Sequence, residues 1–166
     1  MNIDAIVYTS NTGFTARYAA MLEKKTGLPV LPLKESLQKL SRGSRVIYLG
    51  WLCAGNVKGM KKARRQFSIA AVCAVGMAMQ DSDYLDKLAR QADVKTVPLF
   101  YLRGGYRPEK LTGLYKPMMA AMSRAVTKNP PKSAEEKAMQ EAFRRGGDWV
   151  SEGQLNPVLE WLAGSA

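Results

Sequence analysis

Short apolar runs alternate with amphipathic segments along the chain. Residues 3–8, 28–33, 45–50, 68–75 and 94–102 are rich in branched and aromatic side chains, which predicts five buried strands. Between and after these runs, residues 16–26, 35–40, 59–66, 82–92 and 152–163 have the spacing or composition of helices. The pattern therefore predicts an alternating series of strands and helices.

Strands that alternate with helices predict right-handed βαβ crossovers, and hence a parallel sheet with helices on both faces. The length of 166 residues fits one domain with a sizeable core. Five such strands fit a doubly wound sheet of order 2-1-3-4-5. We therefore expect a three-layer α/β sandwich that binds its ligand beyond the carboxyl ends of the first and third strands.

The turn after the first predicted strand is rich in hydroxyl groups. It reads Ser10-Asn11-Thr12-Gly13-Phe14-Thr15 and leads directly into a predicted helix. Backbone N–H groups of such a turn converge near the positive end of the helix dipole. The turn contains no lysine, so it predicts a phosphate site built from neutral donors; the alternative is a simple helix cap. It matches neither a Walker A loop nor a dinucleotide fingerprint.

This turn resembles the phosphate loop of the flavodoxins, which reads Thr/Ser-x-Thr-Gly-x-Thr after the first strand. Ser10, Thr12, Gly13 and Thr15 match its fixed positions. The resemblance covers roughly residues 1–102 and 150–163. It implies a flavodoxin-like fold, FMN as the cofactor and electron transfer as the activity. It also implies that the FMN phosphate is bound by Ser10, Asn11, Thr12, Gly13, Phe14 and Thr15.

Two further segments are similar in position to the flavin-binding loops of flavodoxins. The first directly follows the third strand and consists of Trp51, Leu52, Cys53, Ala54, Gly55 and Asn56. The resemblance implies that it packs against the isoalloxazine ring, although Trp51 alone would also suit a core position at the end of the sheet. The second follows the fourth strand and consists of Met77, Ala78, Met79 and Gln80. It lacks the aromatic residue of the family, for which Tyr84 is a candidate.

The reactive side chains of the sequence are few. Histidine is absent, and Cys53 and Cys73 lack the spacing of a zinc site, so no catalytic or metal-ligating residue is proposed. We expect both thiols to be reduced, with Cys53 a small residue near the flavin. No signal-peptide pattern follows Met1, and no apolar run approaches the roughly 20 residues of a membrane span. The expected location is cytoplasmic.

Residues 103–147 lie between the fifth strand and the last helix, where a typical flavodoxin has no such insertion. Apolar residues recur at helical spacing in its first half, and Ser133 begins a second helix with a capping box. The position is similar to that of the insertion in flavodoxin-like protoporphyrinogen oxidases, which act with membrane quinones. The apolar stripe of the first helix docks on a membrane or partner, packs on the sheet as part of the core, or covers the flavin.

The net charge of +11 is concentrated in two basic runs, at residues 58–65 and 103–132. Such runs suit an acidic protein, an anionic membrane surface or a nucleic acid, and the alternative is a solvated helix face. No RNA-binding aromatic motif, helix-turn-helix or zinc spacing accompanies them, which argues against nucleic acid.

The sequence therefore favours one flavodoxin-like domain over residues 1–166, with a helical insertion at about 103–147. The favoured function is FMN-dependent electron transfer with a redox protein or a small molecule. The alternative is an FMN-dependent oxidoreductase, quinone-linked or similar to the protoporphyrinogen oxidases, whose insertion covers the substrate or docks at the membrane. A basic nucleic-acid-binding module is a third hypothesis.

Overall fold

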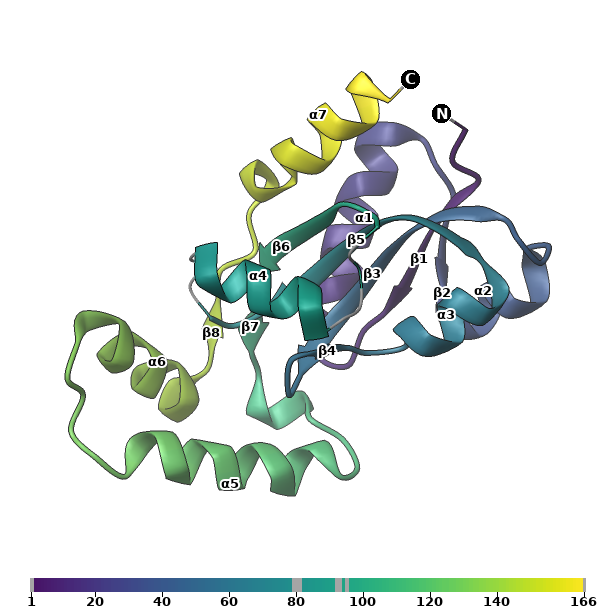
Figure 1. Cartoon of the computed structure of the whole chain (residues 1–166). Helices are drawn as coiled ribbons and strands as arrows, with labels where there is room; N and C mark the ends of the chain where they lie inside the picture. The colour runs from purple at the N-terminus through teal and green to yellow at the C-terminus, as the bar shows by residue number, and fades with distance from the viewer. Residues whose placement is uncertain (1, 79–81, 92–93, 95, 166) are drawn as a thin grey trace.

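The computed structural model describes residues 2–78, 82–91, 94 and 96–165. A mostly parallel sheet forms its centre, and helices cover both faces (Figure 1). The parallel strands follow each other across the sheet in the order β2-β1-β3-β5-β6. These strands are β1 (Ala5–Thr9), β2 (Val30–Pro32), β3 (Arg45–Cys53), β5 (Ser68–Gly76) and β6 (Leu99–Arg103).

The sheet has six strands, so the predicted count of five is wrong. The additional strand is β4 (Asn56–Val57), which runs antiparallel to the end of β3. It pairs Leu52 with Val57 and Cys53 with Asn56. A strand of two residues has no hydrophobic periodicity of its own, which is why the sequence pattern did not reveal it.

Each face of the sheet buries its own apolar cluster. One face packs against α1 (Phe14–Thr26) and α7 (Asn156–Gly164), and the other against α2 (Leu33–Lys39), α3 (Met60–Gln66) and α4 (Ser82–Gln91). Successive side chains of β1 alternate between them, because Ile6 joins the first cluster whereas Ala5 and Val7 join the second. This arrangement makes three layers.

Helix α1 begins and ends at glycines in the left-handed conformation, Gly13 with φ of 101° and Gly27 with φ of 71°. The Gly27 N–H donates to the Glu23 carbonyl and closes the helix, while Lys24 and Lys25 occupy the last turn, where cations oppose the dipole. The predicted end of this helix at Thr26 is therefore confirmed, whereas the helix begins at Phe14 rather than at Ala16.

The insertion leaves and rejoins the domain through a short antiparallel ladder. Strand β7 (Gly105–Tyr106) pairs with β8 (Gly147–Asp148). Between them lie the 3-10 helix η1 (Pro108–Lys110), α5 (Tyr115–Thr127) and α6 (Ala134–Arg145). Helix α5 lies below the carboxyl edge of the sheet, with α6 beside it (Figure 1).

Ser133 caps α6 by accepting a hydrogen bond from the Glu136 N–H at 3.1 Å, as predicted. The Glu136 carboxylate in turn accepts from the Lys132 N–H at 2.6 Å. The buried Gln140 amide donates to the carbonyls of Val126 and Asn129, and so holds α6 against the end of α5.

Three predicted boundaries need correction. Trp51, Leu52 and Cys53 are not loop residues, because β3 continues to Cys53 and is paired there with β4. The fifth parallel strand begins at Leu99 rather than near residue 94. The C-terminal helix begins with a separate 3-10 turn, η2 (Glu152–Leu155), before α7.

Candidate functional site

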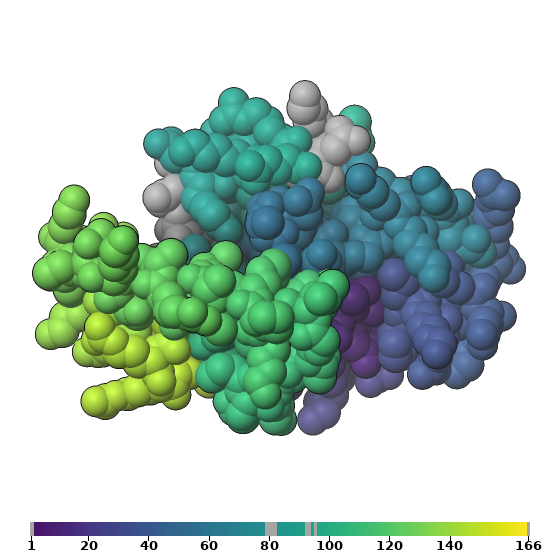
Figure 2. Space-filling model, turned by 90° about the horizontal axis from the view of Figure 1, so that it is seen from below, coloured from purple at the N-terminus to yellow at the C-terminus, as the bar shows by residue number. Residues whose placement is uncertain are grey.

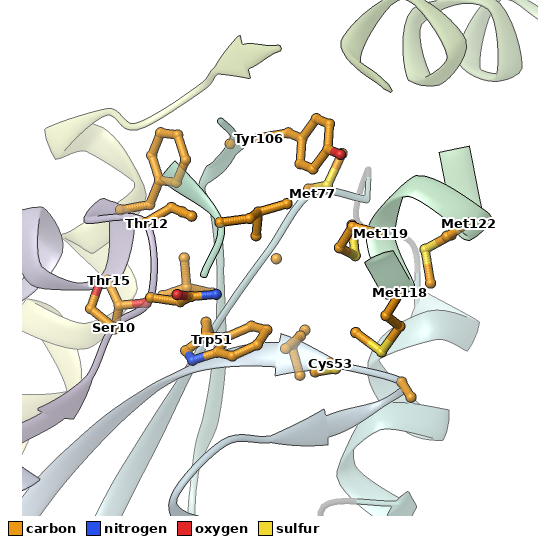
Figure 3. A pocket seen from close by; sticks show the side chains of 18 of the residues that line it. Ser10, Thr12, Thr15, Trp51, Cys53, Met77, Tyr106, Met118, Met119 and Met122 are labelled. Atoms are coloured by element: carbon orange, nitrogen blue, oxygen red, sulfur yellow. The ribbon is translucent and has the colours of Figure 1, made fainter. Parts of the chain in front are cut away.

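A cavity of about 230 Å³ opens beside the carboxyl ends of β1, β3 and β5. The loop after β1 forms one wall, the β3–β4 hairpin forms a second, and α5 lies opposite the loop. Figure 3 shows Ser10, Thr12 and Thr15 facing Met118, Met119 and Met122 across this space, with Trp51 between them. The cavity therefore joins a polar wall to an apolar one.

The polar wall is the turn that leads into α1. Gly13 has φ of 101°, and its N–H donates to the Ser10 hydroxyl at 3.2 Å. No side chain caps α1, and its first turn contains no acidic residue. The partial positive charge of the helix N-terminus is therefore not neutralised by its own first turn.

The hydroxyl groups of Thr12 and Thr15 complete this wall. Both residues line the cavity, and neither hydroxyl has a hydrogen-bond partner within the described part of the chain. Thr15 is only 1% exposed, so its hydroxyl has little access to bulk water. An acceptor in the cavity would satisfy both groups.

Asn11 gives the clearest sign of a missing acceptor. Its side-chain nitrogen is buried and has no hydrogen-bond partner, while its oxygen lies 3.5 Å from the Thr112 hydroxyl of the insertion. Leaving such a donor unsatisfied costs about 1–3 kcal/mol. Because Asn11 also lines the cavity, an anionic ligand with several acceptor atoms fits this donor set.

Trp51 forms the side wall at the end of β3. Its ring meets Tyr115 of α5 edge to face, with centroids 4.7 Å apart and an interplanar angle of 82°. The Lys58 Nζ lies 5.8 Å from the Trp51 ring centroid and 5.3 Å from that of Tyr115. Trp51 belongs to neither apolar cluster of the sheet, so it is not the core residue that the sequence left as an alternative.

The hairpin that follows Trp51 turns through Ala54 and Gly55. Both have positive φ, 49° and 74°, and the flanking Cys53 and Asn56 pair with each other. This is the geometry of a tight type I′ turn. It brings Ala54 and Gly55 to the cavity wall, whereas Asn56 is exposed and donates its side-chain amide to the Ala54 carbonyl.

The segment after β5 contributes Met77 to the cavity. Its backbone is anchored from the neighbouring strand, because Arg103 Nε donates to the Met77 carbonyl at 3.1 Å and the Tyr101 hydroxyl to the Ala78 carbonyl at 2.8 Å. Burial raises the pKa of Tyr101, so this hydroxyl stays protonated as a donor. Met79 and Gln80 lie outside the described residues.

Most of the predicted binding residues therefore meet at one place. The cavity is lined by Ser10, Asn11, Thr12, Phe14, Thr15, Trp51, Leu52, Cys53, Ala54, Gly55 and Met77. Gly13 lies within the same turn but not on the wall, and Asn56 and Ala78 are absent from it. Tyr84, the proposed replacement for the missing aromatic, also lines the cavity.

Several lining residues were not predicted as ligand contacts. They are Val75, Gly76, Gly105, Tyr106, Leu111, Met118, Met119 and Met122. The helical spacing of Leu111, Met118 and Met122 could have identified these three residues, because it predicts an apolar helix face that can cover a ligand. Gly105 and Tyr106 carried no such signal, since only the pairing of β7 with β8 brings them to the cavity.

None of the described residues that line the cavity carries a formal charge at neutral pH. Asp148 of β8 forms two ion pairs: it accepts from Arg17 of α1 at 2.5 Å and from Arg107 of the insertion at 3.3 Å. Partial burial tends to raise the pKa of Asp148, but its bonds to Arg17 and the Val150 N–H and the nearby Arg107 outweigh this, so the pKa is lowered. Any anion in the cavity would therefore be held by neutral donors and the helix dipole.

The two thiols differ in environment. Cys53 is half-buried at the cavity, and both cysteines are free. Cys73 is in the core, and burial raises its pKa to about 12, so it stays protonated. Within the described residues, no group of three or more histidine, cysteine or acidic side chains could hold a metal ion. None of the helices in the described part of the chain has the length and apolar character needed to cross a bilayer.

A scan against protein-family models gave no match for this sequence, and a search of curated proteins found no match either.

Proposed function

We propose that this chain is an FMN-binding, flavodoxin-like redox protein that transfers electrons. The observation that carries the proposal is the cavity in which an uncapped helix N-terminus and the unpaired Asn11 amide meet Trp51 at the carboxyl ends of β1 and β3. Ligands of doubly wound sheets bind at this position. The β2-β1-β3-β5-β6 succession of parallel strands supports the flavodoxin-like assignment.

One group of cavity residues suits the phosphate of FMN, and another group suits its ring system. The donors at Asn11, Thr12 and Thr15, with the first N–H groups of α1, would bind the phosphate. The ring system would lie toward Trp51, Tyr84 and the methionines of α5. The flavin supplies the redox chemistry, and the protein binds it, orients it and limits its contact with water.

The cavity volume constrains how the ring is bound. At about 230 Å³ it is smaller than the roughly 300–1,000 Å³ of pockets that enclose ligands of this size. FMN therefore requires either an outward displacement of α5 or a ring with one edge in solvent. Helix α5 suits displacement, because it has no buried residue.

The first experiment identifies the cofactor by absorbance and mass after purification, followed by titration of the apoprotein with FMN. In the variant Thr12→Val with Thr15→Val, affinity should fall at least tenfold, since each lost hydrogen bond to a charged group is worth about 1.5–3 kcal/mol. Thr26→Val with Thr127→Val is a matched control, because those hydroxyls bond only backbone groups at helix ends away from the cavity. Unchanged affinity in the first variant would exclude this phosphate site.

A second candidate, an FMN-dependent oxidoreductase, is favoured by one observation. Met118 and Met122 line the cavity yet remain 38% and 42% exposed, so a substrate placed beside the ring would cover them. Turnover of a quinone or porphyrinogen by the flavin-loaded protein would favour the enzyme, whereas one-electron exchange without turnover would favour the carrier.

A further inference from the structure

The whole net charge of the chain comes from two segments. Residues 58–66 contain five basic residues and no acidic one, and residues 103–132 contain seven basic residues and one acidic. The rest of the chain contains thirteen basic and thirteen acidic residues, so it is balanced. The charge of +11 is therefore a local property of these two segments rather than a general feature of the surface.

The two segments meet beside the cavity. Lys58 lies between β4 and α3, and its Nζ is 5.3 Å from the ring centroid of Tyr115 at the start of α5. The backbone there is fixed, because the buried Tyr48 hydroxyl donates to the Lys58 carbonyl at 2.7 Å. Figure 2 shows α5 and the segment containing α3 on one face of the molecule.

Seven exposed cations make up what we call the basic surface. Three lie on α3, one at the end of η1, and three on α5 or at its C-terminal end: Lys61, Lys62, Arg65, Lys110, Lys116, Arg124 and Lys128. None of the seven forms an ion pair within the described part of the chain. Their mutual repulsion is not relieved by the protein itself, and an anionic partner would relieve it.

The outward side of α5 does not suit a lipid surface. Helices that lie on membranes insert bulky apolar side chains, but Met118, Met119 and Met122 are directed to the cavity and Tyr115 to Trp51. Apart from the methionines, the exposed positions of α5 are Lys116, Pro117, Ala120, Ala121, Arg124 and Ala125. Only Leu114, 86% exposed at the start of the helix, is both bulky and directed away from the cavity among the described residues.

A nucleic acid is also a poor match. Binding of single strands relies on exposed aromatic side chains on which bases stack. Among the described residues the large exposed apolar side chains are Leu114, Met118 and Met122, and none is aromatic. Trp51 and Tyr115, the aromatic residues nearest to the basic surface, are occupied by each other and by Lys58.

We propose that the basic surface docks an acidic protein, with Leu114 as an apolar contact among the cations. A charged surface with a small apolar centre is typical of transient protein interfaces, in which charge guides the approach. A partner bound there would lie next to the cavity. That it exchanges electrons with the bound group rests on the proposed function, whereas the docking itself does not.

The test measures binding of a dye-labelled, strongly acidic [2Fe–2S] ferredoxin to the full chain at low salt by fluorescence anisotropy. Lys62→Glu with Lys116→Glu removes charge from both halves of the basic surface, and each new glutamate falls in the first turn of a helix, where it is tolerated. Lys24→Glu with Arg42→Glu changes the net charge equally, but near the amino-terminal edge of the sheet. Circular dichroism checks that both variants are folded.

We expect the first variant to lose affinity for the ferredoxin at least tenfold, and the control variant to stay within about threefold of the parent. Binding by the parent should weaken as salt rises above about 0.15 M, where the Debye length is about 8 Å. Equal losses in both variants would mean that only net charge matters and would overturn the proposal. Absence of binding would overturn it as well. The proposal would also be overturned if the chain bound phosphatidylserine vesicles or a single-stranded oligonucleotide more tightly than the ferredoxin, and if that binding depended on Lys62 and Lys116. None of these readings requires bound flavin, so they are independent of the FMN assignment.

Discussion

Ala54 holds a backbone conformation that its side chain disfavours. Its φ of 49° lies in the left-handed region, and it is the only non-glycine residue with positive φ among those the structure describes. Such a conformation costs an L-residue about 1–2 kcal/mol. The two-residue turn between Cys53 and Asn56 imposes it, since a type I′ turn needs positive φ at both central positions. Because Ala54 lines the cavity, this strain lies at the candidate site.

Replacing Ala54 by asparagine should relieve part of this strain. Asn-Gly is the preferred pair for a type I′ turn, so we expect Ala54→Asn to raise the free energy of unfolding by about 1 kcal/mol. Chemical denaturation measures this change. Gly55→Ala is the opposing control, since Gly55 has φ of 74° and an added Cβ would approach the Gln91 side chain. An unchanged or reduced stability in Ala54→Asn would contradict the turn assignment.

At the scale of elements, α5 contacts the sheet strand β3 at one end and α6 of the insertion at the other. Tyr115 packs against Trp51 at one end, and the Gln140 amide binds the carbonyls of Val126 and Asn129 at the other. No residue of α5 is buried. Its methionines line the cavity without belonging to either core cluster. The helix therefore covers the site while contributing little to the stability of the sheet.

This attachment predicts that Met118→Ser with Met122→Ser changes ligand binding more than stability. Both side chains are more than one third exposed, so the loss of unfolding free energy should stay below about 1 kcal/mol, whereas FMN affinity should fall several-fold. Met60→Ser on α3 is the matched control: Met60 is 5% exposed, and large-to-small changes in a core cost about 2–5 kcal/mol. A large loss of stability in the double variant, with unchanged affinity, would identify the stripe as core.

The sequence predicted the elements whose signals are local. The apolar runs of β1, β3 and β5 and the glycines beside α1 carry their own evidence, and so does the Ser133 cap of α6. By contrast, β4, β7 and β8 have two residues each, and only tertiary pairing defines them. The turn at residues 10–15 was identified from a local signal of the same kind, and its binding of a phosphate stays a prediction. The contribution of Gly105 and Tyr106 to the cavity was not predicted, because it depends on where the insertion returns.

At the scale of the whole molecule, the positive charge and the cavity are close but separate. Among the described residues no charged side chain lines the cavity, although three cations contact its wall: Lys58 beside Trp51, Arg107 over the Phe14 ring, and Arg103, which donates to the Met77 carbonyl. The basic segments therefore act on a bound ligand through their summed field rather than through ion pairs. Such a field stabilises negative charge in the cavity and is weakened by dissolved salt.

If the chain binds FMN as proposed, this field predicts a salt-dependent potential for the flavin. Full reduction makes the flavin anionic, so a positive field should raise the potential of the last electron step at low salt, and added salt should lower it. Because roughly 59 mV corresponds to 1.4 kcal/mol for one electron, even a modest field gives a measurable shift. Redox titrations between about 20 mM and 500 mM salt should show a fall of some tens of millivolts, over Debye lengths from roughly 20 Å to 4 Å. Lys58→Gln should reduce this dependence, whereas Lys24→Gln, at the far end of α1, should leave it nearly unchanged. A potential that is strongly negative at every salt concentration, or that rises with salt, would show that the basic segments do not act on the flavin.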